Sequence, residues 1–314
     1  MTETSPRQGK VVRIDKGFAH VHTPGGVMKC ALRGKLKRGP RRARNVVAVG
    51  DEVIVRPTAA GEGVIEQVLE RRSKLSRPDN FRPEVEHVIV ANVDLLVAVS
   101  SVDEPPFNAG LVDRFTVAAR VQELELLILL NKVDLGFPDE VRSVLDELEA
   151  VGFDYLPVSA STGEGLDLLR DRLRGKTAVF SGHSGVGKST ILNALIPDFH
   201  TRVAPVSERT GRGKHTTTRV ELVHAPDLEA FIADTPGVKL FGIWGIPAVE
   251  LGFFFPEFEP YIHDCRFNDC THRNEPGCAV KEAVERGDVS PRRYKSYLNI
   301  FEDLLEMEEQ TRGY

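Results

Sequence analysis

Eight residues in the middle of the chain have the composition of a phosphate-binding loop. Residues 182–189 match the pattern G-x-x-x-x-G-K-[ST] at every specified position, after an apolar strand and before a helical pattern. Glycines let the backbone turn its N–H groups toward phosphates at a helix N-terminus, where anions are stabilised. We expect Lys188 to reach the β- and γ-phosphates of a nucleotide and the Ser189 hydroxyl to bind Mg²⁺. The residues predicted to contact the nucleotide here are Gly182, His183, Ser184, Gly185, Val186, Gly187, Lys188, Ser189 and Thr190.

A second motif has the chemistry to select guanine. The tetrad consists of Asn131, Lys132, Val133 and Asp134. The Asp134 carboxylate can accept hydrogen bonds from N1–H and the 2-amino group of guanine, whereas adenine offers neither donor. Because N-K-x-D also occurs by chance, the prediction depends on a partner motif after the next strand. That motif contains Ser159, Ala160 and Ser161, and we expect the Ala160 N–H to hold the guanine O6.

The order of these motifs predicts an unusual connectivity. The tetrad lies about fifty residues upstream of the phosphate loop, whereas ordinary GTPases have the phosphate loop first. Both motifs must still meet on one nucleotide. The order therefore predicts a circularly permuted GTPase, in which the chain of the G domain has been cut and rejoined elsewhere.

Two further segments match the parts of a GTPase that sense the γ-phosphate. Asp234 ends a strand before Thr-Pro-Gly, and we expect it to hold Mg²⁺ through water while the Gly237 N–H senses the γ-phosphate. The polar, glycine-flanked residues 211–218 suit a switch segment whose threonine binds Mg²⁺ in the GTP state. Thr217 is the first choice for that ligand, with Thr216 and Thr218 as alternatives.

The residue after Gly237 predicts slow unaided hydrolysis. Val238 stands where many GTPases have the glutamine that orients the attacking water, and an aliphatic side chain cannot do this. Another group must position the water, and His215 in the switch segment is the candidate catalytic residue. The alternative is that His215 is a solvated loop histidine.

A cluster of cysteines and a histidine near the C-terminus predicts a metal site. Cys265, Cys270, His272 and Cys278 offer three thiolates and one imidazole within fourteen residues. This is a complete tetrahedral set for zinc, and a closed site of four protein ligands is structural rather than catalytic. The alternative is a set of reduced, unliganded cysteines. The remaining Cys30 lies in a strand pattern and is most simply a buried apolar residue.

The N-terminal part of the chain reads as a small barrel. We expect five short strands separated by polar turns, at residues 11–14, 17–22, 27–32, 46–55 and 63–68. This pattern fits a barrel of the OB type, a fold that often binds nucleic acid but also serves as an adaptor. Residues 1–75 carry 16 Lys+Arg against 7 Asp+Glu, a net of +9, and residues 33–44 form a basic loop. The charge favours a polyanionic partner such as nucleic acid, although a merely solubilising loop would have the same composition.

The middle and end of the chain read as an α/β unit followed by helices. We expect residues 73–84 to be a linker, and strands at residues 94–100, 125–130, 155–158, 177–180, 219–223 and 230–233. Helices are expected at residues 108–122, 139–150, 166–173, 188–195 and 280–309, the last interrupted near Pro291. Alternating strands and helices predict a mostly parallel, doubly wound sheet. The predicted domains are an OB-like β-barrel (1–75), a circularly permuted α/β P-loop GTPase domain (76–245) and a zinc-binding helical domain (246–314).

Composition places few further limits on function. No apolar stretch is long enough to span a membrane, and the first residues lack the form of a secretory signal. We therefore expect a cytoplasmic monomer without a membrane partner.

Three features occur together here: the barrel-like start, the permuted motif order and the C-x₄-C-x-H-x₅-C cluster. In this combination the chain closely resembles the RsgA family of GTPases, also called YjeQ or YloQ, over essentially its full length. The resemblance implies a late assembly factor that binds the small ribosomal subunit and its rRNA through the OB and zinc domains. It also implies subunit-stimulated hydrolysis of GTP to GDP, Mg²⁺ with the nucleotide, one structural Zn²⁺, and a catalytic role for His215.

Two other classes of function remain open from the residues alone. One is a nucleic-acid chaperone whose nucleotide site gates binding with negligible turnover. The other is a GTPase that governs a protein or membrane partner, for which the basic barrel would be incidental. Phosphate release with and without small subunits distinguishes the first, and the salt dependence of binding distinguishes the second.

Overall fold

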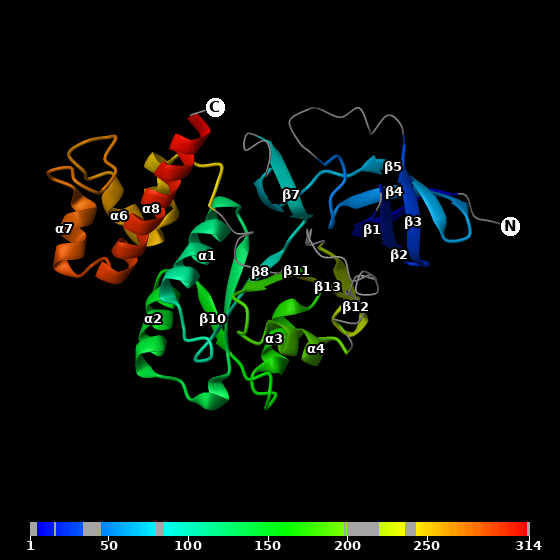
Figure 1. The fold of residues 1–314 in the computed structure, drawn as a ribbon, viewed down its shortest axis with the longest axis horizontal. Helices are drawn as coiled ribbons and strands as arrows, with labels where there is room; N and C mark the ends of the chain where they lie inside the picture. Colours follow the sequence, from blue (N-terminus) through cyan, green and yellow to red (C-terminus); the bar gives the residue numbers. More distant parts are fainter. Residues whose placement is uncertain are drawn as a thin grey trace, which may run out of the picture.

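Three structural units follow one another along the chain. The computed structural model describes residues 5–15, 17–33, 45–79, 85–197, 199, 220–235 and 243–312. A β-barrel and a C-terminal helical region lie on opposite sides of a central α/β unit (Figure 1). None of the helices among the described residues has the length and apolar composition needed to span a bilayer.

The N-terminal unit is a closed five-stranded barrel, as the strand pattern predicts. Its strands are β1 (Arg7–Asp15), β2 (Phe18–Thr23), β3 (Gly26–Leu32), β4 (Glu52–Ala59) and β5 (Glu62–Val68), closed in the order β1-β2-β3-β5-β4. Cys30 is fully buried inside the barrel, and burial raises the pKa of its thiol to about 11. The strand predicted at residues 46–55 begins only at Glu52. The chain turns at Gly50, whose φ of +89° strongly favours glycine. Residues 34–44 of the predicted basic loop lie outside the described residues.

The segment predicted as a linker contains a strand. Within residues 73–84, β6 (Lys74–Pro78) pairs antiparallel with β7 (Glu86–Ala91). The prediction was wrong because Pro78 and the polar residues around it resemble loop sequence, whereas the stabilising contacts come from distant parts of the chain. The Ser76 N–H donates to the Gln122 side chain at 2.7 Å, and the Ser76 carbonyl accepts from the Trp244 indole at 2.9 Å. This hairpin therefore joins the barrel to the central unit.

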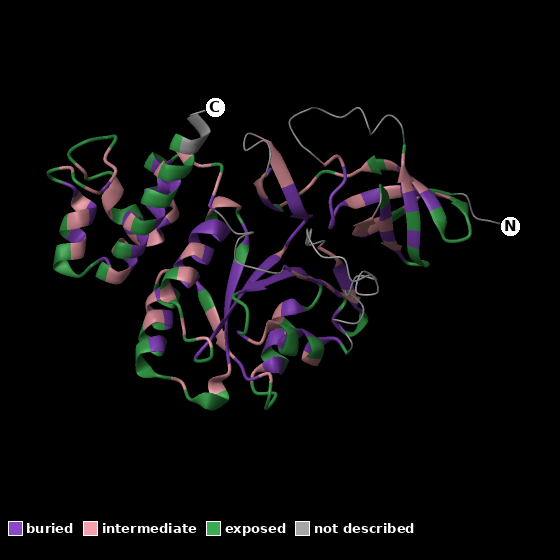
Figure 2. Cartoon of the chain, viewed as in Figure 1, coloured by how far each residue is buried: buried purple, intermediate pink, exposed green. Residues whose placement is uncertain are grey.

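The central unit is a doubly wound sheet, as predicted. Its strands have the order β10-β9-β8-β11-β13-β12 and are β8 (Leu95–Ser101), β9 (Glu125–Asn131), β10 (Asp154–Pro157), β11 (Thr177–Gly182), β12 (Leu222–Ala225) and β13 (Ala230–Asp234). All neighbours pair parallel except β12, which runs antiparallel at the edge. The four helices are α1 (Ala109–Val121), α2 (Asp139–Ala150), α3 (Leu166–Leu173) and α4 (Lys188–Leu195). Buried strands lie beneath helices on both faces (Figure 2).

This strand order explains how separated motifs meet. Strand β9 ends at the tetrad and β11 ends at the phosphate loop, and both are hydrogen-bonded to β8. Because the three strands are parallel, their carboxyl ends lie at the same edge of the sheet. Ligands of open α/β sheets bind at that edge.

The C-terminal region is built around a core that it shares with α1. It contains η6 (Ala248–Phe254), η7 (Pro256–Phe258), α6 (Glu259–Ile262), α7 (Ala279–Arg286) and α8 (Pro291–Arg312). Val117 and Ala118 of α1 are buried in this core, whereas Phe115 of α1 packs in the core of the sheet unit. One face of α1 therefore packs in the core of the sheet, and another face packs in the core of the C-terminal region.

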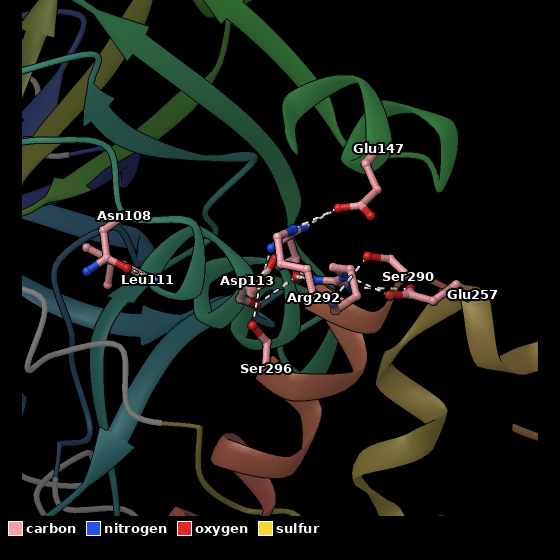
Figure 3. Close-up of polar contacts among 10 residues, drawn as sticks. Asn108, Leu111, Asp113, Glu147, Glu257, Ser290, Arg292 and Ser296 are labelled. Carbon is pink, nitrogen blue, oxygen red and sulfur yellow. Dashed lines mark hydrogen bonds and ion pairs between the residues drawn. The ribbon is translucent and has the colours of Figure 1, made fainter. Parts of the chain in front are cut away.

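A charge network with a buried centre joins α8 to α1 and α2. Figure 3 shows Arg292 directed toward Glu147 of α2 and Asp113 of α1, with hydrogen bonds of 2.8 and 2.6 Å. The neighbouring Arg293 donates to Asp113 at 2.9 Å and to Glu257 at 2.6 Å. Asp113 and Arg293 are 0% and 1% exposed. Such pairs are tolerated in an interior only when every charge has partners, so the network specifies one docking geometry for the C-terminal region.

Removal of Arg293 should destabilise the protein strongly. Arg293→Met leaves Asp113 and Glu257 buried with fewer partners, and we expect a loss of about 3 kcal/mol in the free energy of unfolding. Denaturant unfolding followed by circular dichroism measures it. Arg286→Met is the control, because the Arg286–Asp288 pair at the end of α7 is exposed. Equal stability of the two variants would contradict a structural role for the network.

The barrel packs on the edge strand β12 through a cluster of histidines. The rings of His22 on β2 and His224 on β12 have centroids 4.4 Å apart, and both lie against Phe231 of β13. Arg13 of β1 faces Glu221 at 3.6 Å in the same contact. Burial, followed by the nearby His224, lowers the pKa of His22 below its ordinary value. The contact therefore favours the neutral form of the His22 imidazole.

Acid should weaken this contact. A histidine whose pKa is lowered by folding binds more protons in the unfolded chain, so its contribution to stability is lost as the pH falls below about 6.5. We expect the urea midpoint to drop between about pH 7.5 and about pH 5.5, and to drop less in His22→Asn. An identical pH dependence in the wild type and the variant would show that His22 is not involved.

Candidate nucleotide site and metal centre

Asn131 physically links the three motifs of the nucleotide site. It ends β9 and is 2% exposed. Its amide nitrogen donates to the Val186 carbonyl of the phosphate loop at 2.9 Å, and its Oδ1 accepts the Ala160 N–H at 3.1 Å. One side chain thus connects loops that are 55 and 29 residues away in sequence.

Asp134 is held as an ionised acceptor. The Ser159 hydroxyl donates to its Oδ1 at 2.6 Å, and Ser161 lies 2.9 Å from the Ser159 hydroxyl. The hydrogen bond from Ser159 is the main cause that keeps the pKa of Asp134 below its usual value. An exposed carboxylate fixed in this way can accept two hydrogen bonds from the guanine edge. Ser159 therefore orients the residue that the sequence predicts to bind the base.

The phosphate loop requires glycine at specific positions. Gly185 and Gly187 both have φ of +87°, a region that other residues rarely adopt. A Cβ on Gly187 would lie 2.2 Å from the Asn131 amide nitrogen, and one on Gly182 would lie 2.2 Å from the Val99 carbonyl. The glycines therefore allow the loop to approach both the tetrad and β8. Helix α4 begins directly after the loop at Lys188.

The two charged residues expected near the phosphates lie together. The Lys188 ammonium is 3.9 Å from the Asp234 carboxylate at the end of β13. Thr235 follows Asp234 and is fully buried, with its hydroxyl and N–H both donating to the Phe180 carbonyl of β11 at 3.0 Å. Thr235 thus anchors the strand end that carries Asp234 beside the strand that carries the phosphate loop.

Other predicted residues lie outside the described residues. They are His215, Thr216, Thr217, Thr218, Gly237 and Val238. Their roles remain predictions.

A loop that matches none of the predicted motifs also borders the site. The Lys132 ammonium donates to the Glu104 carbonyl, and a Cβ on Gly185 would lie 3.3 Å from Pro105. The loop after β8 therefore lies against both the tetrad and the phosphate loop. The sequence could have indicated this loop, because it directly follows a buried parallel strand and ligands bind at the carboxyl ends of such strands.

The cysteine cluster has the geometry of a tetrahedral zinc site. The four ligand atoms of Cys265, Cys270, His272 and Cys278 lie within 4.8 Å of one another. The Cys265 and Cys278 sulfurs are 3.9 Å apart, and His272 Nδ1 is 3.5 and 3.4 Å from them. Tetrahedral zinc with bonds of about 2.3 Å to sulfur and about 2.0 Å to nitrogen places two sulfurs about 3.8 Å apart, and a sulfur and a nitrogen about 3.5 Å apart. The residues fit the metal.

The chemistry of the four donor side chains also indicates a bound cation. Burial is the main cause that raises the pKa of the Cys270 thiol to about 12, and burial raises the pKa of Cys278 as well. Thiolates in this environment need a bound metal to remain deprotonated. Zinc would supply structural cross-linking here, since all four positions are taken by protein ligands.

Hydrogen bonds hold the ligand loop in shape. Glu275 accepts from the Thr271 N–H and hydroxyl and from the Arg273 N–H. Burial opposes ionisation of Glu275, but these hydrogen bonds outweigh it and lower its pKa to about 2. From α8, the hydroxyls of Tyr294 and Tyr297 donate to the His272 and Thr271 carbonyls at 2.7 and 2.6 Å. Sequence spacing predicted the four residues of the cluster, which the structure brings together, but not these supporting residues.

The fold and the site together define a class of protein. A doubly wound sheet brings a guanine-type tetrad on β9 and a phosphate loop on β11 to one edge, with the tetrad first in the chain. The class is a circularly permuted GTPase.

Comparison with known proteins specifies the family. A model described as RsgA GTPase matches residues 68–244, and one described as RsgA N-terminal domain matches residues 8–65. The small ribosomal subunit biogenesis GTPase RsgA of Chlorobaculum tepidum is 44% identical over 308 residues, covering 95% of this chain and 98% of that protein. Its counterpart in Gemmatimonas aurantiaca is 39% identical over 305 residues, covering 96% and 99%. The chain belongs to the RsgA family of small ribosomal subunit biogenesis GTPases and is a GTP hydrolase.

Solved structures agree with this assignment. The crystal structure of YjeQ from Thermotoga maritima matches with a TM-score of 0.76 and 36% identity, covering 96% of this chain and 99% of that one. The structure of YloQ, described as a circularly permuted GTPase, matches with a TM-score of 0.74 and 29% identity over 98% of each chain. The resemblance predicted from sequence is confirmed.

Proposed function

We propose that this GTPase binds the small ribosomal subunit in the cytoplasm, as a monomer, and hydrolyses GTP to GDP and phosphate late in subunit maturation. The observation that carries the proposal is the Asn131 side chain, which connects the phosphate loop to the base-reading loop. The names of its relatives, which refer to small ribosomal subunit biogenesis, support the choice of the subunit as partner.

Each predicted site residue has a defined task in this proposal. Asp134 and the Ala160 N–H read the guanine, and the backbone of residues 182–190 holds the phosphates with Lys188. The hydroxyls of Ser189 and Thr217 and, through water, the Asp234 carboxylate would hold Mg²⁺, which would neutralise charge on the nucleotide phosphates. Gly237 senses the γ-phosphate through its N–H.

Hydrolysis depends on a group that orients water toward the γ-phosphate. Val238 cannot do this, so we assign the task to His215 in the switch segment. The switch segment places His215 for hydrolysis only when the small subunit is bound. Turnover is therefore low in the free protein and high in the complex.

The outer units bind the subunit in this proposal. The barrel domain (1–75) carries a net charge of +9 and contacts rRNA. The GTPase domain (76–245) hydrolyses GTP, and the zinc domain (246–314) makes a second contact with the subunit and its rRNA. The segment after Asp234 leads to Trp244, whose indole donates to β6. A change at the γ-phosphate therefore has a route along the chain to the zinc domain, and a second route through the Trp244 hydrogen bond to the hairpin of β6 and β7. These routes couple nucleotide state to release.

Phosphate release on purified small subunits tests the proposal. We expect subunits to stimulate the wild type, and His215→Ala to lower the stimulated rate by about 10²-fold while GDP affinity stays unchanged. A malachite-green assay measures the rate. His263→Ala is the matched control, because His263 is exposed and lies outside the phosphate loop and the switch segment.

The same assay separates the alternatives. Turnover that subunits do not change would contradict subunit stimulation and favour a nucleotide-gated chaperone. Subunit binding that does not weaken between low and high salt would contradict rRNA contacts, since phosphate contacts are strongly salt dependent.

A further inference from the structure

Three exposed apolar side chains gather around one groove in the C-terminal region. Val249, Phe253 and Phe267 are 59%, 58% and 41% exposed. All three line a cavity of about 410 Å³ whose lining also includes Ile262 and the edge of the zinc-ligand loop at His272. We call this cavity, lined by residues of η6 and of the loop 267–272, the zinc-side groove. Exposed apolar patches of this kind mark sites where proteins meet partners.

The exposure of Phe253 is imposed by the packing of its neighbours. In the same segment, Leu251 and Phe255 are fully buried in the C-terminal core and occupy its inner face. Gly252 lies against the His272 ring, where an added Cβ would be 3.1 Å from the nearest ring atom. Phe253 therefore points outward because the inner face is already filled. The groove is a built feature of the zinc-supported fold.

The charge of the groove differs from that of the barrel. Glu250 and Asp269 line it, and the described residues that form its walls include no lysine or arginine. Arg266 lies over the Phe267 ring at 5.6 Å but is not among the lining residues. Acidic groups beside an apolar surface repel RNA phosphates and attract a cationic partner. An aromatic platform for RNA bases would instead be flanked by basic residues.

We propose that the zinc-side groove binds a segment of a small-subunit protein, with an apolar side chain between Phe253 and Phe267 and lysine or arginine near Glu250 and Asp269. The inference rests on the proposed binding to the small subunit and specifies one of its contacts. The barrel contacts RNA, and this groove contacts protein. The protein thus recognises both the RNA and the protein of the small subunit.

Site-specific cross-linking identifies the occupant of the groove. Full-length, zinc-loaded protein carrying the photoreactive residue p-benzoylphenylalanine in place of Phe253 is bound to purified small subunits with a non-hydrolysable GTP analogue. We expect cross-links to a subunit protein, within a peptide rich in lysine and arginine. The matched control carries the same residue in place of Leu168, which is 60% exposed on α3, and should not give that product. Cross-links from position 253 to rRNA alone, or none from a bound complex, overturn the proposal.

Charge reversal gives a second test with a predicted sign. The double variant Glu250→Lys with Asp269→Lys should bind small subunits about 10-fold more weakly, because two favourable contacts become repulsive. An RNA partner would make the same variant bind more tightly, and that result overturns the proposal. The control is Glu285→Lys with Glu306→Lys, which makes the same change in net charge on exposed residues outside the groove.

The outcomes distinguish this inference from the function on which it rests. Wild-type protein that does not sediment with small subunits contradicts both. Wild-type protein that binds, with reversed charges in the groove and in the control giving equal affinity, contradicts only the assignment of the groove.

Discussion

Asp134→Asn should lower the affinity for GDP and GTP by about 10³-fold, because the carboxylate that accepts both guanine donors is replaced by an amide. The Asn131 side chain still links the two loops, and Ser159 keeps a partner at position 134. The phosphate loop should therefore remain formed, and the loss should be specific to the base. Isothermal titration with GDP, GTP and ADP measures the three affinities.

The same variant should gain affinity for xanthosine diphosphate. Xanthine has an oxygen in place of the guanine 2-amino group, and the asparagine amide can donate to it. This gain controls for misfolding, because a damaged site would bind neither nucleotide. Unchanged preference for guanine over adenine nucleotides in Asp134→Asn would contradict the assigned role of the tetrad.

Cys278→Ser should remove zinc and unfold the ligand loop. Structural zinc contributes binding free energy of order 10 kcal/mol to folding, and a hydroxyl is a poor replacement for a thiolate. Cys278 is almost fully buried, so no other ligand can reach the site easily. We expect one zinc per wild-type chain by elemental analysis and almost none in the variant. Hydrogen exchange should show lost protection over residues 263–278.

Cys30→Ala is the matched control for this change. Cys30 is buried in the barrel, far from the cluster in sequence, and packs as an apolar residue. This variant should keep its zinc and the protection of the ligand loop. Full zinc content in Cys278→Ser would contradict the four-ligand assignment.

Features encoded by adjacent residues could be predicted from the sequence. Residues 182–189 and the cysteine spacing each specify a local geometry, so their chemistry can be recognised without the fold. The bounds predicted for α2, α3 and α4 agree with the structure, because each helix has an apolar periodicity with clear ends. The circular permutation could be predicted from the positions of two motifs, the tetrad at residues 131–134 and the phosphate loop at residues 182–189.

Features that depend on distant partners could not be predicted. Strand β6 forms because Ser76 meets Gln122 and Trp244, and nothing in the local sequence shows those contacts. Asp113 and Arg293 each look like ordinary helix-surface charges, yet the docking of α8 on α1 buries both. The exposure of Phe253 likewise follows from the filled core behind it.

The most direct test of the account is a crystal structure of the protein with GDP. We expect the guanine N1–H and 2-amino group within hydrogen-bonding distance of the Asp134 carboxylate, and the β-phosphate enclosed by the N–H groups of residues 184–189. Asn131 should still connect the two loops. A nucleotide that contacts only one of the motifs, or that binds elsewhere, would contradict the claim that they form a single site.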